Sequence, residues 1–165
     1  MKFPVCKVCL KNDILCQNCN SKISEIGISP DELKAFRSLG KASEKYSILK
    51  DVEVNRVLDT PRMMLIFTDT ENASKIIGKK GGMIKKLSDD LGKPIRIVTS
   101  KNVESFVREV FYSNHILGVN VVYGGEKLYK IRFPSSEKGE MPLDIEKFSK
   151  FFNSIFNEKV RVVFE

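Results

Sequence analysis

The chain has 165 residues, of which 42% are hydrophobic and 30% charged, and its formal net charge at pH 7 is +7. This hydrophobic content is enough for one or two small cores and excludes an intrinsically disordered chain. No apolar run is long enough to cross a bilayer, and the first residues lack the apolar core of a signal peptide, so we expect a cytoplasmic protein with no membrane partner.

The first segment, residues 1–28, contains all four cysteines. Cys6 and Cys9 form one C-x-x-C hook, and Cys16 and Cys19 form a second. Each hook can place two thiolates around one tetrahedral metal ion, and four thiolates suit zinc. We therefore predict a small module that holds one structural Zn²⁺ ion, with two disulfides or an iron–sulfur centre as alternatives. A redox C-x-x-C enzyme fits less well, because neither pair is expected to open a helix at the end of a strand.

The next segment, residues 29–100, mixes helix and strand patterns. Ser29 and Pro30 signal the start of a helix, and Gly40 is expected to end it. Further along, the apolar spacing predicts strands around 52–58 and at 63–67, short helices over about 72–77 and 83–91, and a strand at 95–97.

A lysine turn with glycine at both ends, Gly78-Lys79-Lys80-Gly81, joins the two short helices. Glycine has no Cβ, so the backbone of such a turn can approach a nucleic-acid strand, and the next helix directs its free amides to the same place. Residues 72–88 hold five lysines and no acid, which favours a polyanionic partner over an ordinary solvated helix face. An ordinary helix–turn–helix connection is the alternative.

From residue 101 the pattern starts again. The predicted elements are an amphipathic helix around 103–111, a hairpin of strands over 116–123 and 129–133 with a two-residue loop at Gly124 and Gly125, a helix at 145–155 and a strand at 160–164. The order matches residues 29–100 except that one helix and the glycine turn are missing. Residues 101–165 are also nearly neutral, with ten basic and nine acidic residues.

The run KIIGKKGGMI, from Lys75 to Ile84, resembles the KH signature I-I-G-x-x-G-x-x-I. In that family the isoleucines that match Ile77 and Ile84 help to form an apolar floor for unstacked bases, while the turn grips the RNA backbone. Simple core packing is the alternative for both isoleucines. The order of elements resembles the type II KH arrangement, and two such modules in tandem resemble the KH pair of NusA, in particular the short archaeal NusA-like proteins.

This resemblance implies an α+β fold with three parts: a zinc-binding module at 1–28, a type II KH domain at 29–100, and a degenerate KH-like domain at 101–165. Each KH-like part would have a three-stranded sheet with helices on one face. The implied partner is single-stranded RNA, and the implied RNA-binding residues are Lys75, Ile77, Gly78, Lys79, Lys80, Gly81, Ile84 and Lys85.

The resemblance to NusA implies a transcription elongation or termination factor that acts with RNA polymerase. A ribosome-associated or RNA-processing KH protein, and a zinc-bearing adaptor for protein partners, are the alternatives. We expect no enzyme and no small-molecule substrate, because the sequence has no phosphate-binding loop, dinucleotide fingerprint or catalytic motif around its single histidine, His115.

Overall fold

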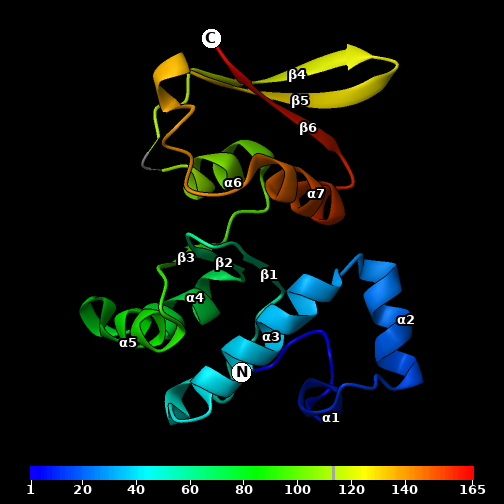
Figure 1. Cartoon of the computed structure of the whole chain (residues 1–165), viewed down its shortest axis with the longest axis vertical. Coiled ribbons are helices and arrows are strands. Elements are labelled where there is room, and N and C mark those ends of the chain that lie inside the picture. Colours follow the sequence, from blue (N-terminus) through cyan, green and yellow to red (C-terminus); the bar gives the residue numbers. More distant parts are fainter. Residues whose placement is uncertain (113) are drawn as a thin grey trace. The chain divides into compact units, whose positions relative to one another are not determined.

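The computed structural model describes residues 1–112 and 114–165 and divides into two compact units (Figure 1). The first unit is Met1–Thr99 and the second is Ser100–Glu165. Each unit contains a three-stranded sheet together with helices, which confirms the predicted α+β class. Over the residues described, no helix combines the length and the apolar character needed to cross a membrane.

The first unit begins with three helices, α1 (Lys7–Lys11), α2 (Gln17–Ile26) and α3 (Pro30–Ser43). Ser29 caps α3 as predicted, because its hydroxyl accepts a hydrogen bond of 3.1 Å from the amide of Glu32. The predicted helix end at Gly40 is wrong, since α3 continues to Ser43.

Gly40 serves packing rather than termination. A Cβ built on Gly40 would lie 3.3 Å from the ring of Phe3, so the glycine lets that ring approach α3 closely. The Phe3 ring centroid lies 5.0 Å from that of Phe36, which is fully buried. The start of the chain is thereby packed onto α3 through an aromatic pair.

The sheet of the first unit has the strand order β1 (Arg56–Asp59), β2 (Met64–Phe67) and β3 (Ile95–Val98). A short 3₁₀ helix, η1 (Ser47–Leu49), precedes it. Strands β1 and β2 are antiparallel, whereas β2 and β3 are parallel and therefore need a crossover connection. That crossover consists of α4 (Thr70–Ile77), the 3₁₀ turn η2 (Lys79–Gly81) and α5 (Gly82–Leu91).

Strand β1 is shorter than the sequence predicted. Val52 and Val54 are buried as expected, but they precede β1. The backbone around them pairs with Lys2, whose amide donates to the carbonyl of Val52 at 2.8 Å and whose carbonyl accepts from Val54 at 2.8 Å. Their apolar character therefore reflects burial beside this bridge rather than membership of the sheet.

A buried ion pair ties α3 to β1. The Nε and Nη2 atoms of Arg56 donate to the two carboxylate oxygens of Glu32 at 2.8 and 2.9 Å, and the amide of Val57 donates to the same carboxylate at 3.0 Å. The side chains of both charged residues are less than a tenth exposed. Removing one partner would leave an unpaired buried charge, at a cost of about 3–5 kcal/mol.

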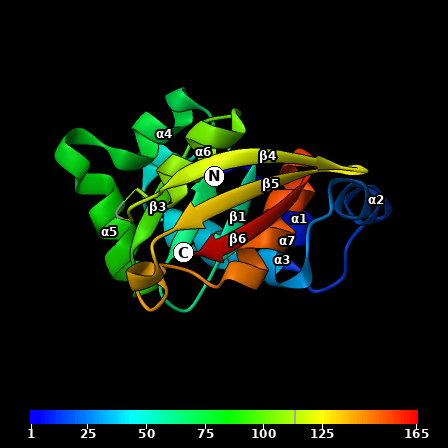
Figure 2. The same ribbon diagram turned by 90° about the horizontal axis from the view of Figure 1, so that it is seen from above.

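The second unit contains α6 (Val103–Val110), β4 (Gly118–Gly124), β5 (Glu126–Phe133), the 3₁₀ turn η3 (Ser135–Glu137), α7 (Ile145–Phe156) and β6 (Lys159–Phe164). Its sheet has the order β4-β5-β6, and Figure 2 looks onto the face of this sheet that α6 and α7 do not cover. As in the first unit, the first pair of strands is antiparallel and the second pair is parallel.

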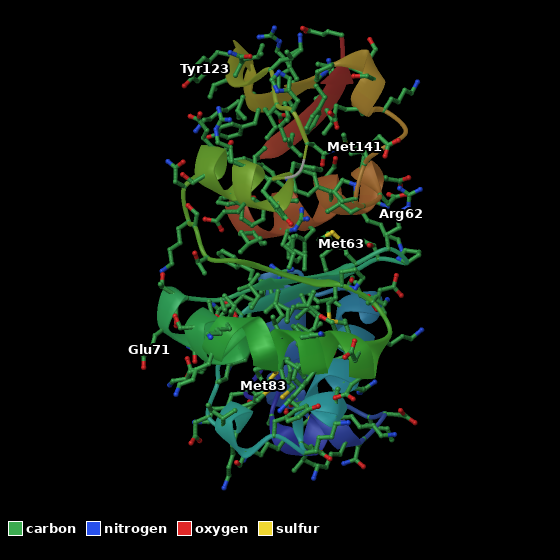
Figure 3. All side chains as sticks on the ribbon, turned by 90° about the vertical axis from the view of Figure 1, so that its left-hand side faces the viewer. Arg62, Met63, Glu71, Met83, Tyr123 and Met141 are labelled. Atoms are coloured by element: carbon green, nitrogen blue, oxygen red, sulfur yellow. The ribbon has the colours of Figure 1, made fainter. Side chains whose placement is uncertain are left out.

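The hairpin loop of the second unit differs from the prediction. Gly124 is paired with Glu126 across the hairpin, and of the two loop glycines Gly125 alone has a positive φ, of 90°. Figure 3 shows Tyr123 near this tip, where its side chain is 79% exposed. Beneath the sheet, the core is aromatic, with Phe106, Phe111, Phe133, Phe148 and Phe152 fully buried.

Candidate functional site

The predicted turn, Gly78–Gly81, is bent and open to solvent; we call it the glycine turn. Helix α4 ends at Ile77, after which Gly78 adopts φ 71° and ψ −178°, and the turn closes with positive φ at Lys80 (51°) and Gly81 (73°). The side chains of Lys79 and Lys80 are both exposed. Two cationic side chains therefore extend from a backbone that has glycine at both ends.

Gly78 is required by both conformation and space. Its combination of φ and ψ lies in a region that residues with a Cβ essentially do not occupy. A Cβ built there would lie 2.7 Å from the Cβ of Met83 and 3.0 Å from its backbone nitrogen. Met83 packs against the core of the first unit, and Figure 3 shows it beneath α5. The sharp exit from α4 therefore depends on glycine at this position.

The two isoleucines that precede the turn have different environments. Ile76 is fully buried, whereas Ile77 is 40% exposed. Core packing, the alternative for Ile77, therefore does not apply to this residue, whereas Ile76 belongs to the buried cluster of the first unit. Ile84, on the first turn of α5, is half-buried. An apolar surface consequently adjoins the glycine turn on both of its sides.

A shallow groove follows α5 and the start of β3; we call it the α5 groove. Its volume is about 610 Å³, and Ile84 and Lys85 line it at the end next to the glycine turn. Gly92, Lys93 and Ile95 line it further on. Lys93 is paired with Asp59 at 2.6 Å, whereas Lys85 is exposed and, within the residues described, has no carboxylate at salt-bridge distance.

Six of the eight predicted RNA-binding residues therefore lie in one continuous stretch, the glycine turn together with Ile84 and Lys85 of the α5 groove. Ile77 adjoins the turn at the end of α4. Lys75 lies further back on α4, where it forms an ion pair with Glu71 at 3.4 Å, so part of its charge is already balanced. Figure 3 shows Glu71 pointing away from the molecule.

Sequence reasoning missed the far end of the groove, which is formed by Ser88, Asp89, Gly92, Lys93, Pro94 and Ile95. These residues come from the end of α5 and the start of β3. Apolar spacing identifies the core face of α5 but not the residues that line the groove. The alternation of Ile95 with Ile97 predicted the strand β3, whose first residue lines this end of the groove.

The α5 helix adds an electrostatic contribution to the turn. Gly81 is its N-cap residue and has no side chain to accept from the first amides of the helix. The amide of Gly82 donates to the carbonyl of Lys79, and no side chain caps the amides that follow. The positive end of the helix dipole thus lies beside Lys79 and Lys80, an arrangement that favours a bound phosphate.

The four cysteines form a second candidate site. The Sγ atoms of Cys6, Cys9, Cys16 and Cys19 all lie within 4.8 Å of one another. Each hook opens a helix: Cys6 is the N-cap of α1, and Cys16 is the N-cap of α2. Four thiol ligands gathered this closely fit one tetrahedral metal ion, so the cluster could hold a metal, and its all-sulfur donor set is consistent with zinc.

Amide-to-sulfur hydrogen bonds cross between the two hooks. The amide of Cys16 donates to Sγ of Cys9 at 3.1 Å, and the amide of Cys6 donates to Sγ of Cys19 at 3.3 Å. Amides that point at sulfur stabilise thiolate, which is the form that binds metal. The two hooks thus form a single ligand set, with Cys9 and Cys19 buried and the other two exposed.

The thiols differ in acidity. An amide hydrogen bond from Cys9, with help from the neighbouring thiols, lowers the pKa of Cys6 to about 7. The amide of Cys16 acts to lower the pKa of Cys9, but burial and the other three thiols outweigh it and raise the pKa of Cys9 to about 12. The exposed thiol of Cys6 therefore ionises first, while a cation would be needed to keep the buried thiol of Cys9 ionised near neutral pH.

The cysteine segment packs on α3. One nitrogen of Arg37, Nη2, donates to the carbonyls of Cys9 and Asn12 at 3.2 and 2.7 Å. Cys9 and Cys19 belong to the same buried cluster as Phe36. The first unit consequently contains the cysteine segment as well as the sheet and the glycine turn.

Comparison with known proteins is consistent with this geometry. The sequence model of the KH domain family matches residues 37–111. The crystal structure of APE1850 is similar in fold, with a TM-score of 0.55 and 22% identity over 84% of this chain and all of that chain. No curated protein matches the sequence. Residues 37–111 therefore match a KH domain, a fold that supports nucleic-acid binding, and the glycine turn lies within the matched segment.

Proposed function

We propose that the protein binds single-stranded RNA through the glycine turn and the α5 groove, and acts with RNA polymerase as an archaeal-type, NusA-like elongation or termination factor. It would do so in the cytoplasm and without catalysis. The observation that carries the proposal is the glycine turn itself, a sharp bend with Lys79 and Lys80 exposed, inside the residues that match the KH family.

The backbone of the RNA would lie across the turn. Gly78 and Gly81 have no side chain to obstruct it, and the first amides of α5 together with the two lysines face the phosphates. Unstacked bases would then rest on the exposed surface of Ile77 and on Ile84, with Lys85 beside the strand in the groove. Affinity should fall steeply with salt, because each neutralised phosphate releases counterions.

The RNA-binding step is tested by a double variant, Lys79→Asp with Lys80→Asp. We expect a loss of affinity for single-stranded RNA on the order of tenfold or more, and a salt slope that is shallower by about 1.4, or 0.7 for each lost phosphate contact. Both side chains are exposed and both glycines remain, so circular dichroism and thermal stability should change little.

Lys22→Asp with Lys34→Asp is the matched control. Lys22 lies on α2 and Lys34 on α3, both are exposed, and the control changes net charge by the same amount. If the control loses as much affinity as the turn variant, RNA binding depends on the overall charge of the protein and not on the glycine turn. If the folded turn variant keeps its affinity, the site assignment is wrong.

The role in transcription rests on the resemblance to NusA and needs its own test. A tagged protein at its natural abundance should co-purify with RNA polymerase, and RNase treatment should leave this association in place if direct contact with the polymerase exists. Sedimentation with ribosomal subunits in place of polymerase would instead favour a ribosomal or RNA-processing role.

A further inference from the structure

We propose that a basic pocket between α1 and α3 is a second RNA contact, which receives the strand beyond the nucleotides held at the glycine turn. The proposal extends the RNA binding proposed above and depends on it. The pocket has a volume of about 810 Å³ and lies within the first unit, between α1, the second half of α3 and the residues around η1. Helices α1 and α3 lie side by side there (Figure 1). We call it the α1–α3 pocket.

Positive charge is concentrated on the walls of this pocket. The side chains in its lining that are charged at neutral pH are five cations and one acid, namely Lys7, Lys11, Arg37, Lys41, Lys50 and Glu44. All four lysines are exposed, and among the residues that the structure describes no carboxylate lies at salt-bridge distance from any of them. A surplus of this size around one concavity, in a chain of net charge +7, attracts a polyanion.

Arg37 gives the pocket a fixed cation. Its Nη2 atom donates to the carbonyls of Cys9 and Asn12, and among the residues described no carboxylate lies at salt-bridge distance from it. Its Nε atom is buried and, within the described part of the chain, has no hydrogen-bond acceptor. The carbonyls orient the guanidinium without neutralising it, so its charge remains available to a phosphate.

The pocket also offers apolar and aromatic surface. Leu10 and Tyr46 are half-buried and contribute this surface, while Phe36 lies fully buried behind it. Proteins that hold single-stranded nucleic acid combine a basic channel with aromatic side chains on which bases stack. An extruded base beside Tyr46, with its phosphates near Lys41 and Lys50, would use both kinds of surface.

The α1–α3 pocket adjoins the α5 groove through one side-chain contact. The hydroxyl of Tyr46, in the pocket, donates to Asp90 at 2.6 Å, and Asp90 follows Asp89, which lines the groove. Lys45 also pairs with Asp90, at 2.7 Å, which balances this carboxylate, whereas the exposed Asp89 is the one acid in the lining of the groove. An RNA that leaves the far end of α5 would therefore meet the pocket next. This continuity favours RNA over an acidic protein segment as the occupant.

The test compares a short and a long RNA. A KH turn clamps about four nucleotides, so an RNA of about five nucleotides can fill the turn and groove alone, whereas one of about twenty can also reach the pocket. For Lys41→Glu with Lys50→Glu, we expect about a tenfold loss of affinity for the long RNA, a salt slope shallower by about 1.4, and unchanged binding of the short RNA.

Lys22→Glu with Lys34→Glu is the control, because these exposed lysines lie outside the pocket and the change in net charge is equal. If the pocket variant and this control bind the long RNA equally well, the proposal is overturned, even if an acidic peptide is found to bind the pocket. Failure of the wild-type protein to bind the short RNA would instead overturn the proposed function.

A second measurement needs no substitution in the pocket. The long RNA, carrying photoreactive 4-thiouridine, should cross-link to peptides from α1, the end of α3 or η1 as well as to peptides from α5. Cross-links confined to α4 and α5 would contradict the second contact while leaving the glycine turn as the RNA site.

Discussion

Lys80 illustrates how the glycine turn is constrained at single residues. Among the described residues other than glycine, Lys80 and Asn157 alone have positive φ, at 51° and 53°. Asparagine adopts this conformation readily at a helix end, whereas lysine does so at a cost. A residue held in an unfavourable conformation at an exposed turn suggests that its placement serves binding, since Lys80 contributes nothing to the core.

Gly78→Ala should destabilise the first unit. Alanine would have to adopt φ 71° with ψ −178°, at a cost of about 1–3 kcal/mol, and its Cβ would also contact that of Met83 at 2.7 Å. We expect a lower midpoint in urea denaturation followed by circular dichroism. Weaker RNA binding should accompany it, because relief of the contact distorts the exit from α4.

Gly82→Ala provides the control, because Gly82 has φ −65° and ψ −39° and a Cβ there would meet nothing within 4 Å. Alanine at this first position of α5 should be neutral or stabilising by up to about 1 kcal/mol. Equal effects of the two substitutions would show that the backbone of Gly78 does not hold the turn in this conformation.

The helices and strands themselves were largely predictable, and the errors have a common cause. Capping and apolar periodicity are local signals, and they located α3, α5 and the strands of both sheets. The roles of Gly40 and Ile77 depend on contacts that spacing alone does not encode. Gly40 lies within α3, where the absence of a side chain leaves room for the ring of Phe3, which is distant in sequence. Ile77 is exposed because Ile76 occupies the core position.

The candidate site was predictable to a similar extent. The G-x-x-G pattern located the turn and its lysines, because the chemistry of glycine at a bend is local. The α1–α3 pocket was not predictable, since it collects lysines from α1, α3 and the end of η1 that lie far apart in the sequence. Each of these lysines, taken alone, is indistinguishable from an ordinary surface residue.

Metal removal should disorder the two cysteine hooks and the helices α1 and α2 that they open. Helix α1 has five residues, too few to be stable alone, and its hook is held mainly through the thiol cluster and Arg37. We expect one zinc ion per chain by native mass spectrometry. Its removal by a chelator should cause faster amide hydrogen exchange in α1 and α2 and little change in β2.

Cys9→Ser supplies the comparison, since this variant should lack the metal. Its amide hydrogens in α1 and α2 should exchange rapidly before any chelator is added, and the chelator should cause no further change. Zinc binds thiolates, so its affinity should fall as pH falls and the thiols become protonated. Chelator treatment that leaves exchange in α1 and α2 unchanged would mean that the hooks are held without a metal, and would favour the disulfide alternative if free thiols are also absent.

The whole molecule has two units whose sheets share one topology but whose crossover connections differ. Both sheets join an antiparallel pair to a parallel strand, and only the first has a glycine turn in its crossover. In the second unit the crossover contains η3 and α7 instead. Both RNA contacts proposed here lie in the first unit, so we expect a short RNA to bind without a contribution from the second unit.

This division predicts that each unit can be destabilised separately. Phe152 is fully buried in the second unit and Phe36 in the first, and replacing either with alanine should cost about 3–5 kcal/mol. Hydrogen exchange should accelerate in α7 and β5 for Phe152→Ala, and in α3 and β1 for Phe36→Ala. The short RNA should still bind the Phe152→Ala variant, because the glycine turn and the α5 groove of its first unit are intact. Exchange that accelerates equally in both units for either variant would show instead that the chain unfolds as one cooperative body.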